Sequence, residues 1–114
     1  MSEGKAGEAR RRAEVFAALG DETRLALVAK LCRGEELSIS ELTETAAGAR
    51  MTRQAVTKHL RVLERAGILR CSQAGRERRY AFRPAALEEM RSYLELVSAQ
   101  WDEALGRLKA FVEE

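Results

Sequence analysis

This sequence has few prolines, cysteines, histidines and aromatic residues, and it has no long apolar run. Its one proline is Pro84, so long helices can continue without interruption. No apolar stretch approaches the roughly 20 residues that span a bilayer, and we expect no membrane segment. The N-terminal residues contain no apolar signal core, so the sequence predicts a cytoplasmic protein.

The few thiols and the single histidine give little support for an enzyme or a metal site. Cys32 and Cys71 are too few for a disulfide framework, and we expect small, partly buried apolar fillers. A thiol-based redox sensor is an alternative, because Arg33 and Arg70 are neighbours that can lower a thiol pKa. His59 has no partnered nucleophile near it in sequence, so we expect it to pack or hydrogen-bond, with no catalysis, metal or cofactor.

Positive charge is concentrated in one window of the chain. Residues 50–83 contain ten basic and two acidic residues, a net charge of +8. The whole chain carries only +2, so the remainder carries −6. Such polarity within one small domain indicates a polyanionic partner that contacts one region.

Hydrophobic periodicity and capping residues predict a mainly α fold with a small β-wing, in one domain over residues 1–114. The buried faces are expected at Ala13, Phe16 and Leu19, at Leu25, Val28, Ala29 and Leu31, and at Val56, Leu60, Leu63 and Ala66. Asp21, Ser40 and Thr52 are the predicted N-caps, and Gly20, Gly34, Gly48 and Gly67 the predicted stops. In chain order we expect a frayed tail over residues 1–8, helices over 9–19 and 22–33, a short strand around 37–39, helices over 41–47 and 53–66, strands over 68–73 and 78–82, and a helix over 85–113.

The third and fourth predicted helices are joined by a short turn, which is the spacing of a helix-turn-helix. The basic hairpin that follows, residues 68–83, is then a wing around Gly75. Arg and Gln side chains can pair with guanine and adenine edges in the major groove, whereas cations further along contact phosphates. Alternation along the second wing strand predicts an inward Arg78. The residues expected to contact double-stranded DNA are Thr52, Arg53, Gln54, Thr57, Lys58, Arg61, Arg65, Arg76, Arg78 and Arg79.

The last predicted helix carries a heptad pattern over four consecutive repeats, which favours a helix–helix interface. At about 1.5 Å per residue the helix is roughly 45 Å long, more than one small domain can cover on both sides. A homodimer is therefore expected, and packing of this seam on the first helix of the same chain is the alternative. The seam residues are Leu87, Met90, Leu94, Val97, Trp101, Ala104, Leu108 and Phe111.

Four stretches resemble the ArsR family of winged helix-turn-helix regulators: LGDETRLALVAKL (19–31), ISELTE (39–44), AVTKHLRVLERAGIL (55–69) and GRERRYAF (75–82). The resemblance implies a helical dimer, an inverted-repeat operator of two half-sites, and repression of transcription relieved by an effector. It also implies a location at the nucleoid. The effector and the operator sequence are not encoded in these patterns.

The sequence departs from the family's metal sensors, whose third helix holds two metal-binding cysteines. Ser38 and Ser40 stand at those positions, and serine is a poor ligand for soft metals. The last helix contains no histidine, which other members use for zinc. The chain therefore looks similar to a metal-independent branch whose last helix contains a tryptophan, here Trp101.

The alternative to a DNA-binding regulator is a protein-interaction module on the same scaffold. RNA binding is disfavoured because Tyr80 and Phe82 are expected in the core.

Overall fold

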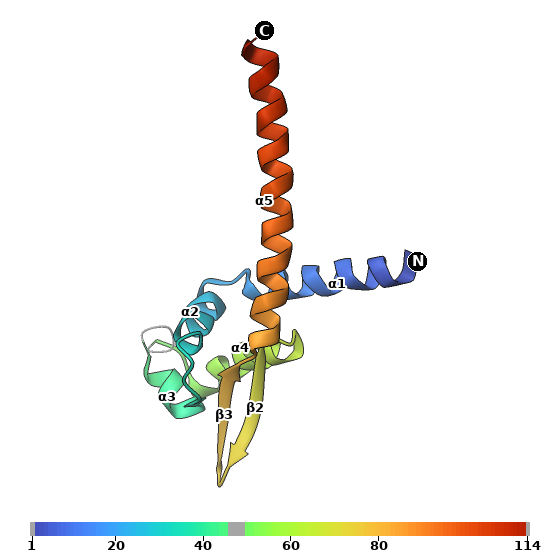
Figure 1. The fold of residues 1–114 in the computed structure, drawn as a ribbon. Helices are drawn as coiled ribbons and strands as arrows, with labels where there is room; N and C mark the ends of the chain where they lie inside the picture. The colour runs from blue at the N-terminus through green and yellow to red at the C-terminus, as the bar shows by residue number, and fades with distance from the viewer. Residues whose placement is uncertain (1, 46–49, 114) are drawn as a thin grey trace. The chain divides into compact units, whose positions relative to one another are not determined.

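A computed structural model of the chain describes residues 2–45 and 50–113. It divides into two units, one ending at Arg83 and one beginning at Pro84, and each is described by itself. The fold is mainly helical with a small three-stranded antiparallel sheet, as the sequence predicts. Figure 1 shows its elements in chain order: α1 (Ser2–Leu19), α2 (Glu22–Leu31), β1 (Leu37–Ser38), α3 (Ile39–Glu44), α4 (Arg53–Arg65), β2 (Leu69–Ala74), β3 (Glu77–Phe82) and α5 (Pro84–Glu113).

Helix α1 is longer than predicted and buries a different face. It begins at Ser2, whereas the sequence predicted a frayed tail up to residue 8. Val15 and Ala18 are its buried residues, while Ala13 is exposed and Phe16 and Leu19 are half-buried. A shift of one residue rotates a helix face by about 100°, so the predicted face was rotated away from the true one. The alanine-rich sequence offers several faces of similar apolarity, and packing against α2 and α4 selects among them.

Helix α2 has the predicted N-cap but ends two residues earlier than expected. The Asp21 carboxylate accepts a hydrogen bond from the Arg24 backbone N–H at 3.0 Å, which confirms the cap. Leu27 and Leu31 are fully buried, and Val28 beside them is also buried. The prediction was wrong for Leu25, which is 53% exposed, and for Ala29, which is exposed. The apolar face lies on the side of Leu27, toward the other helices of the first unit.

Helix α3 begins at Ile39 and is capped by Ser38, so the predicted cap at Ser40 was wrong. The Ser38 hydroxyl accepts from the Glu41 N–H, and the Glu41 carboxylate accepts from the Ser38 N–H, which forms a capping box. Because the helix starts here, the short strand is only Leu37–Ser38. The helix ends at Glu44, before extended Thr45. The predicted stop at Ala47–Gly48 and the turn containing Gly48 lie outside the described residues.

Helix α4 agrees closely with the prediction. The Thr52 hydroxyl accepts a hydrogen bond from the Ala55 N–H at 3.1 Å and caps the helix. Its apolar stripe is fully buried, with half-buried Ala66 at its end. The Gly67 N–H bonds to the Glu64 carbonyl and the Ile68 N–H to the Leu63 carbonyl, which is the Schellman pattern. Gly67 has φ +80°, the left-handed conformation that this pattern requires.

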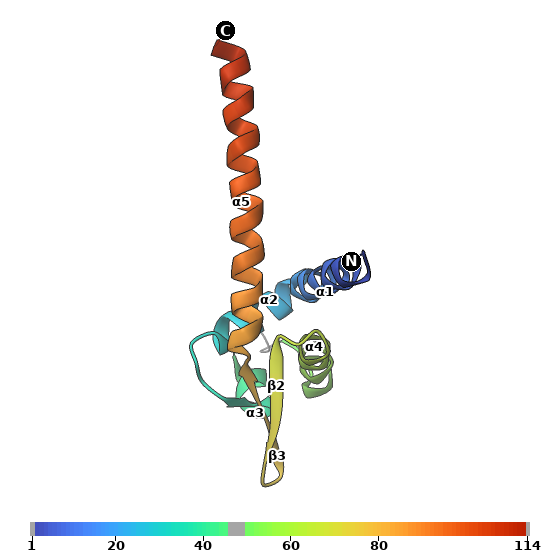
Figure 2. The same cartoon turned by 45° about the vertical axis from the view of Figure 1, so that its right-hand side comes forward.

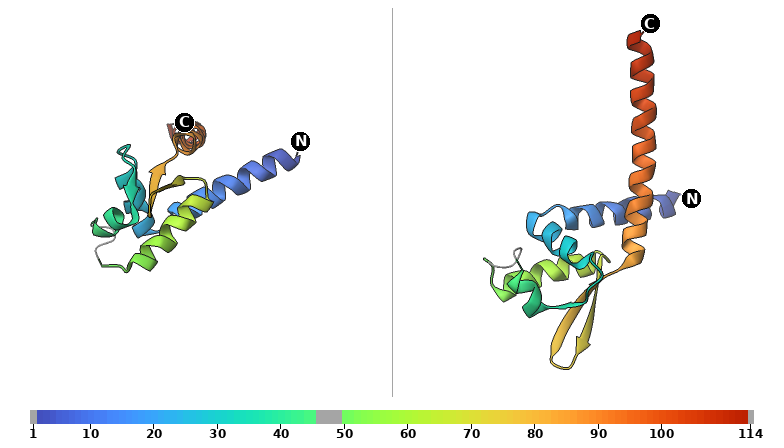
Figure 3. Two further views of the ribbon diagram at one scale, coloured as in Figure 1. Left: turned by 90° about the horizontal axis from the view of Figure 1, so that it is seen from below. Right: turned by 60° about the vertical axis from the view of Figure 1, so that its left-hand side comes forward.

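The sheet has the strand order β1-β3-β2, with both pairings antiparallel. Strands β2 and β3 form the predicted hairpin, in register from Leu69–Phe82 to Ala74–Glu77. Gly75 has φ +64° in the two-residue loop, and the absence of positive φ at Arg76 fits a type II′ turn. Tyr80 is fully buried. Figure 2 shows α4 alongside the base of β2, and the right view of Figure 3 shows the hairpin projecting beyond α3 and α4.

Helix α5 is one continuous helix of 30 residues that begins at the predicted proline. Large apolar side chains are exposed along it, and Trp101 and Phe111 are 65% and 78% exposed. Within the described residues no helix has both the length and the apolar character to cross a membrane. The large apolar residues exposed on α5 are Leu87, Leu94, Leu96, Trp101, Leu105, Leu108, Phe111 and Val112.

Candidate nucleic-acid interface

Helix α4 separates a buried apolar stripe from a polar, cationic face. Val56, Leu60 and Leu63 have no exposed surface, which fixes the rotation of the helix about its axis. The side chains on the other side are therefore held toward solvent. The cationic face consists of exposed Arg53, Gln54, Lys58, Arg61 and Arg65 with half-buried Thr57. The arginine and glutamine side chains of this face can form bidentate hydrogen bonds with base edges. Glu64 is the one acidic residue of α4.

The N-terminal end of this face is preorganised by hydrogen bonds within the protein. An Arg53 guanidinium nitrogen donates to the Ser40 hydroxyl at 3.0 Å, which ties the start of α4 to α3. The Thr57 hydroxyl donates to the Arg53 carbonyl at 2.8 Å, and Thr52 is the N-cap. Gln54 is exposed at the same end and makes no side-chain hydrogen bond to any residue that the structure describes. The Arg53–Ser40 bond was not predicted, since no local sequence pattern connects residues thirteen positions apart.

The outer part of the wing carries two exposed cations. Arg76 in the turn and Arg78 on β3 are both exposed. The inward orientation predicted for Arg78 was wrong, because the β2–β3 hairpin is buried only near its base, at Leu69, Tyr80 and Ala81. The hairpin beyond that base is open on both faces, so strand alternation buries nothing there. The Gln73 side chain donates to the Gly75 carbonyl at 3.2 Å and fixes the turn between them.

Arg79 differs from the other wing arginines because its charge is engaged within the protein. Its side chain is 29% exposed and lies within 3.7 Å of the carboxylates of Glu36, Glu41 and Glu77. Hydrogen bonds from the backbone and side chain of Ser38, with the Arg79 charge, hold the pKa of Glu41 below its usual value. Of the ten residues predicted to contact DNA, Arg79 is the one whose side chain forms ion pairs in the described structure.

A second polar cluster connects the start of α2 to the middle of α4. An Arg24 nitrogen donates to His59 Nδ1 at 3.2 Å, and Arg24 Nε donates to the Ala18 carbonyl. A guanidinium can only donate, so His59 Nδ1 is the acceptor of this hydrogen bond. The Asp21 carboxylate lies 3.8 Å from the same nitrogen. His59 is thus a hydrogen-bonding residue, as predicted, and it helps to hold α4 in place.

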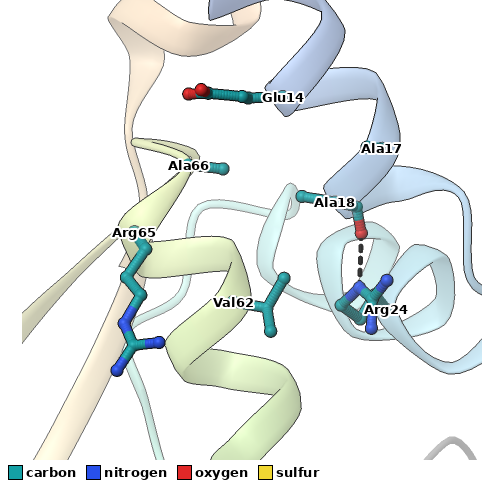
Figure 4. Close-up of a pocket in the computed structure, with 7 residues that line it drawn as sticks. All are labelled: Glu14, Ala17, Ala18, Arg24, Val62, Arg65 and Ala66. Carbon is teal, nitrogen blue, oxygen red and sulfur yellow. Dashed lines mark hydrogen bonds between the residues drawn. The ribbon is translucent and has the colours of Figure 1, made fainter.

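An open groove lies between α1 and α4, with a volume of about 410 Å³ (Figure 4). Its floor is apolar, with Val62 pointing toward Ala18 in the close-up. Arg65 also lines this groove. It is the last residue of α4 and therefore the member of the cationic face that lies furthest from the N-terminal end of the helix. The lining residues are Glu14, Ala17, Ala18, Arg24, Val62, Arg65 and Ala66.

Comparison with known proteins places this geometry in a family. A family model described as a helix-turn-helix domain matches residues 19–72, which span α2, α3 and α4. The HTH-type transcriptional regulator YuzN of Bacillus subtilis is 38% identical over 79 residues, 67% of this chain and 86% of that protein. An ArsR-like transcriptional regulator from Rhodococcus sp. RHA1 is 37% identical with a TM-score of 0.74, covering 92% of this chain and 95% of that one. This chain belongs to the ArsR family.

As an ArsR-type chain it is a DNA-binding helix-turn-helix transcriptional regulator, and its relatives are regulators rather than enzymes. A homodimeric winged helix-turn-helix DNA-binding domain from Mycobacterium bovis shares the fold at 22% identity, with a TM-score of 0.68. The alignment with it covers 90% of this chain and 92% of that one.

The two thiols of this ArsR-type chain are far apart in the sequence, and their surroundings differ. Cys32 is exposed at the end of α2, which corrects the prediction of a partly buried filler, and Cys71 is half-buried on β2. Desolvation raises the pKa of the Cys32 thiol, the opposite direction from an activated thiolate. Among the described residues, no three His, Cys, Asp or Glu side chains are grouped so that they could hold a metal ion.

Proposed function

We propose that the chain binds operator DNA as a homodimer and represses transcription. In this proposal α4 enters the major groove and the wing lies on the flanking backbone. The observation that carries it is the cationic face of α4, whose rotation is fixed by three fully buried residues on the opposite side. A recognition helix must hold its polar face in a fixed orientation, because ordering a mobile element on binding costs conformational entropy and weakens the affinity for DNA.

The two elements have different roles in this proposal. Gln54 and Arg53 lie at the N-terminal end of α4, the end that reaches base edges in helix-turn-helix complexes. Lys58 and Arg61 lie further along and contact phosphates, which position the protein without selecting a sequence. Arg76 and Arg78 extend the phosphate contacts onto the wing, where exposure leaves their charge available.

The exposed heptad seam of α5 supports the dimer. Leu94, Trp101 and Leu108 repeat every seven residues and are all more than half exposed. Burying such side chains against a second α5 stabilises by about 25 cal/mol per Å² of apolar surface. The Mycobacterium bovis relative is itself described as homodimeric. A two-fold symmetric protein matches an operator of two inverted half-sites.

The roles of α4 and the wing are tested with Gln54→Ala and Arg76→Ala, with Arg10→Ala in α1 as a control that removes one exposed cation elsewhere. Operators are first selected from genomic fragments. Gln54→Ala should relax the preference at one position per half-site, at a cost of about 1–3 kcal/mol against the correct base. Arg76→Ala should weaken binding to all sequences and flatten the slope of log affinity against log salt by about one unit.

The opposite pattern would show that the roles are reversed. If Gln54→Ala keeps the sequence preference and Arg76→Ala changes it, the wing reads bases and α4 does not. If the wild-type chain shows no salt-dependent binding to duplex DNA, the protein-interaction alternative is favoured instead.

A further inference from the structure

We propose that Arg79 is a positioning residue that fixes the wing to the start of α3, and that it makes no contact with DNA. This proposal departs from the sequence prediction, which placed Arg79 among the DNA contacts. The part of the inference that concerns DNA affinity rests on the proposed function, whereas the part that concerns the wing does not.

Each nitrogen of the Arg79 guanidinium has a partner within the protein. Nη2 donates to the Glu36 backbone carbonyl at 2.8 Å and lies 3.5 Å from the Glu41 carboxylate. Nε lies 3.6 Å from the Glu36 carboxylate, and Nη1 lies 3.7 Å from that of Glu77. The partners come from the loop before β1, from α3 and from β3 itself. The planar fork of arginine suits such a multiple contact better than the point charge of lysine.

The electrostatics of this cluster oppose a phosphate contact. One guanidinium faces three carboxylates within 3.7 Å, which leaves a local excess of negative charge. A DNA phosphate approaching Arg79 would therefore meet repulsion from Glu36, Glu41 and Glu77 and would have to displace one of them. Arg76 has no ion pair to a described residue, so its charge remains available.

The contacts connect the wing mechanically to the helix-turn-helix. Arg79 lies directly across from Ser38 in the β1–β3 pairing. The Glu41 oxygen that faces Arg79 also accepts from the Ser38 N–H at 3.2 Å, so one carboxylate both caps α3 and holds the wing. On β2, the Ser72 hydroxyl donates to the Glu36 carboxylate at 2.9 Å. Both wing strands are thus tied to the same short segment before α3.

Polar contacts also connect α3 to the cationic face of α4. Ser40 in the first turn of α3 accepts from Arg53 at the start of α4. The wing, α3 and the N-terminal end of α4 therefore share one set of polar contacts around residues 36–41. Loss of Arg79 should release the wing, so that Arg76 no longer has a fixed position relative to α4.

The test compares lysine and alanine at two positions: Arg79→Lys and Arg79→Ala against the matched pair Arg76→Lys and Arg76→Ala. Lysine keeps the charge and serves as a phosphate contact but lacks the fork. Arg76→Lys should therefore stay within about threefold of wild type, whereas Arg79→Lys should lose affinity nearly as much as Arg79→Ala. In the Arg76→Ala background, Arg79→Ala should cost clearly less than it costs alone, because the two act through one wing.

A measurement on the DNA-free protein separates this inference from the proposed function. Hydrogen exchange of the β1–β3 amides should be faster in both Arg79 variants, with α4 amides unchanged; if Arg79→Ala does not fold, Arg79→Lys is measured in the same way. Unchanged exchange in a folded variant would overturn the positioning role. Retained affinity in Arg79→Lys, with effects of Arg79 and Arg76 that add, would instead make Arg79 a phosphate contact. Faster exchange in a protein that never binds DNA would leave the positioning role intact and refute the proposed function.

Discussion

Ser38 and Ser40 at the start of α3 have different roles, although they are two positions apart in the chain. Ser38 caps the helix through its reciprocal bonds with Glu41, and Ser40 accepts from Arg53. The pattern Ser-x-x-Glu over residues 38–41 is the sequence signature of a capping box, so the correct cap could have been found by that rule. The Arg53 contact could not, because it depends on how α3 and α4 pack.

The Asp21 carboxylate should make the stability of the fold depend on pH. The backbone hydrogen bond from Arg24, with the charge of the Arg24 guanidinium, holds the Asp21 pKa below its ordinary value. Its carboxylate therefore stabilises the fold above the unfolded pKa of about 3.9, and this contribution is lost as the pH falls through the lowered folded pKa. Asp21→Asn keeps a good N-cap but removes the charge. Urea unfolding should show wild type more stable than the variant at pH 7, with a difference that shrinks toward pH 3.

A difference between these two proteins that does not change with pH would contradict this account of Asp21. Glu22→Gln is the control, since Glu22 is an exposed neighbour in the same first turn and its substitution alters the charge without altering the cap.

At the scale of the element, the cationic face and buried stripe of α4 were predictable because apolar and charged residues separate onto opposite sides of this helix. Val56, Leu60 and Leu63 follow the helical repeat, and Thr52 and Gly67 mark the ends. In α1 many alanines make several faces nearly equivalent, so neighbouring elements select the buried one. The engagement of Arg79 was not predictable either, since its acidic partners come from three separate segments.

The two faces of α4 should separate stability from DNA binding. Leu60→Ala creates a cavity at a fully buried position and should lower the free energy of unfolding by about 2–5 kcal/mol. Lys58→Ala, two residues away on the exposed face, should change that free energy by less than about 0.5 kcal/mol. The same Lys58 variant should still weaken binding to DNA of any sequence. Denaturant unfolding and DNA titration of both variants check this, and a large stability loss in Lys58→Ala would contradict the assignment of faces.

At the scale of the whole molecule, two long-range sequence features proved informative: the basic window over residues 50–83 and the heptad pattern of the last helix. The window coincides with α4 and the wing in the structure. The heptad pattern falls on one continuous helix whose large apolar side chains are exposed. Such a periodicity indicates a helix–helix interface along this helix.

Truncation after Ser98 should abolish the dimer, because it removes Trp101, Leu108 and Phe111 from the seam. Sedimentation should then give the mass of a monomer, and DNA affinity should fall because one half-site no longer supports the other. Glu103→Ala, an exposed substitution outside the seam, is the control and should remain dimeric. A truncated protein that still sediments as a dimer would show that the seam serves another contact.

The central claim is that the chain recognises a specific duplex sequence through α4, with charge from the wing. The most direct measurement is a titration of the intact protein with its selected operator and with a scrambled duplex, at several salt concentrations. The account predicts an operator affinity at least about a thousandfold above that for the scrambled duplex, with both affinities falling linearly in log–log form as salt rises. Equal affinity for the two duplexes, or binding that does not respond to salt, would contradict it.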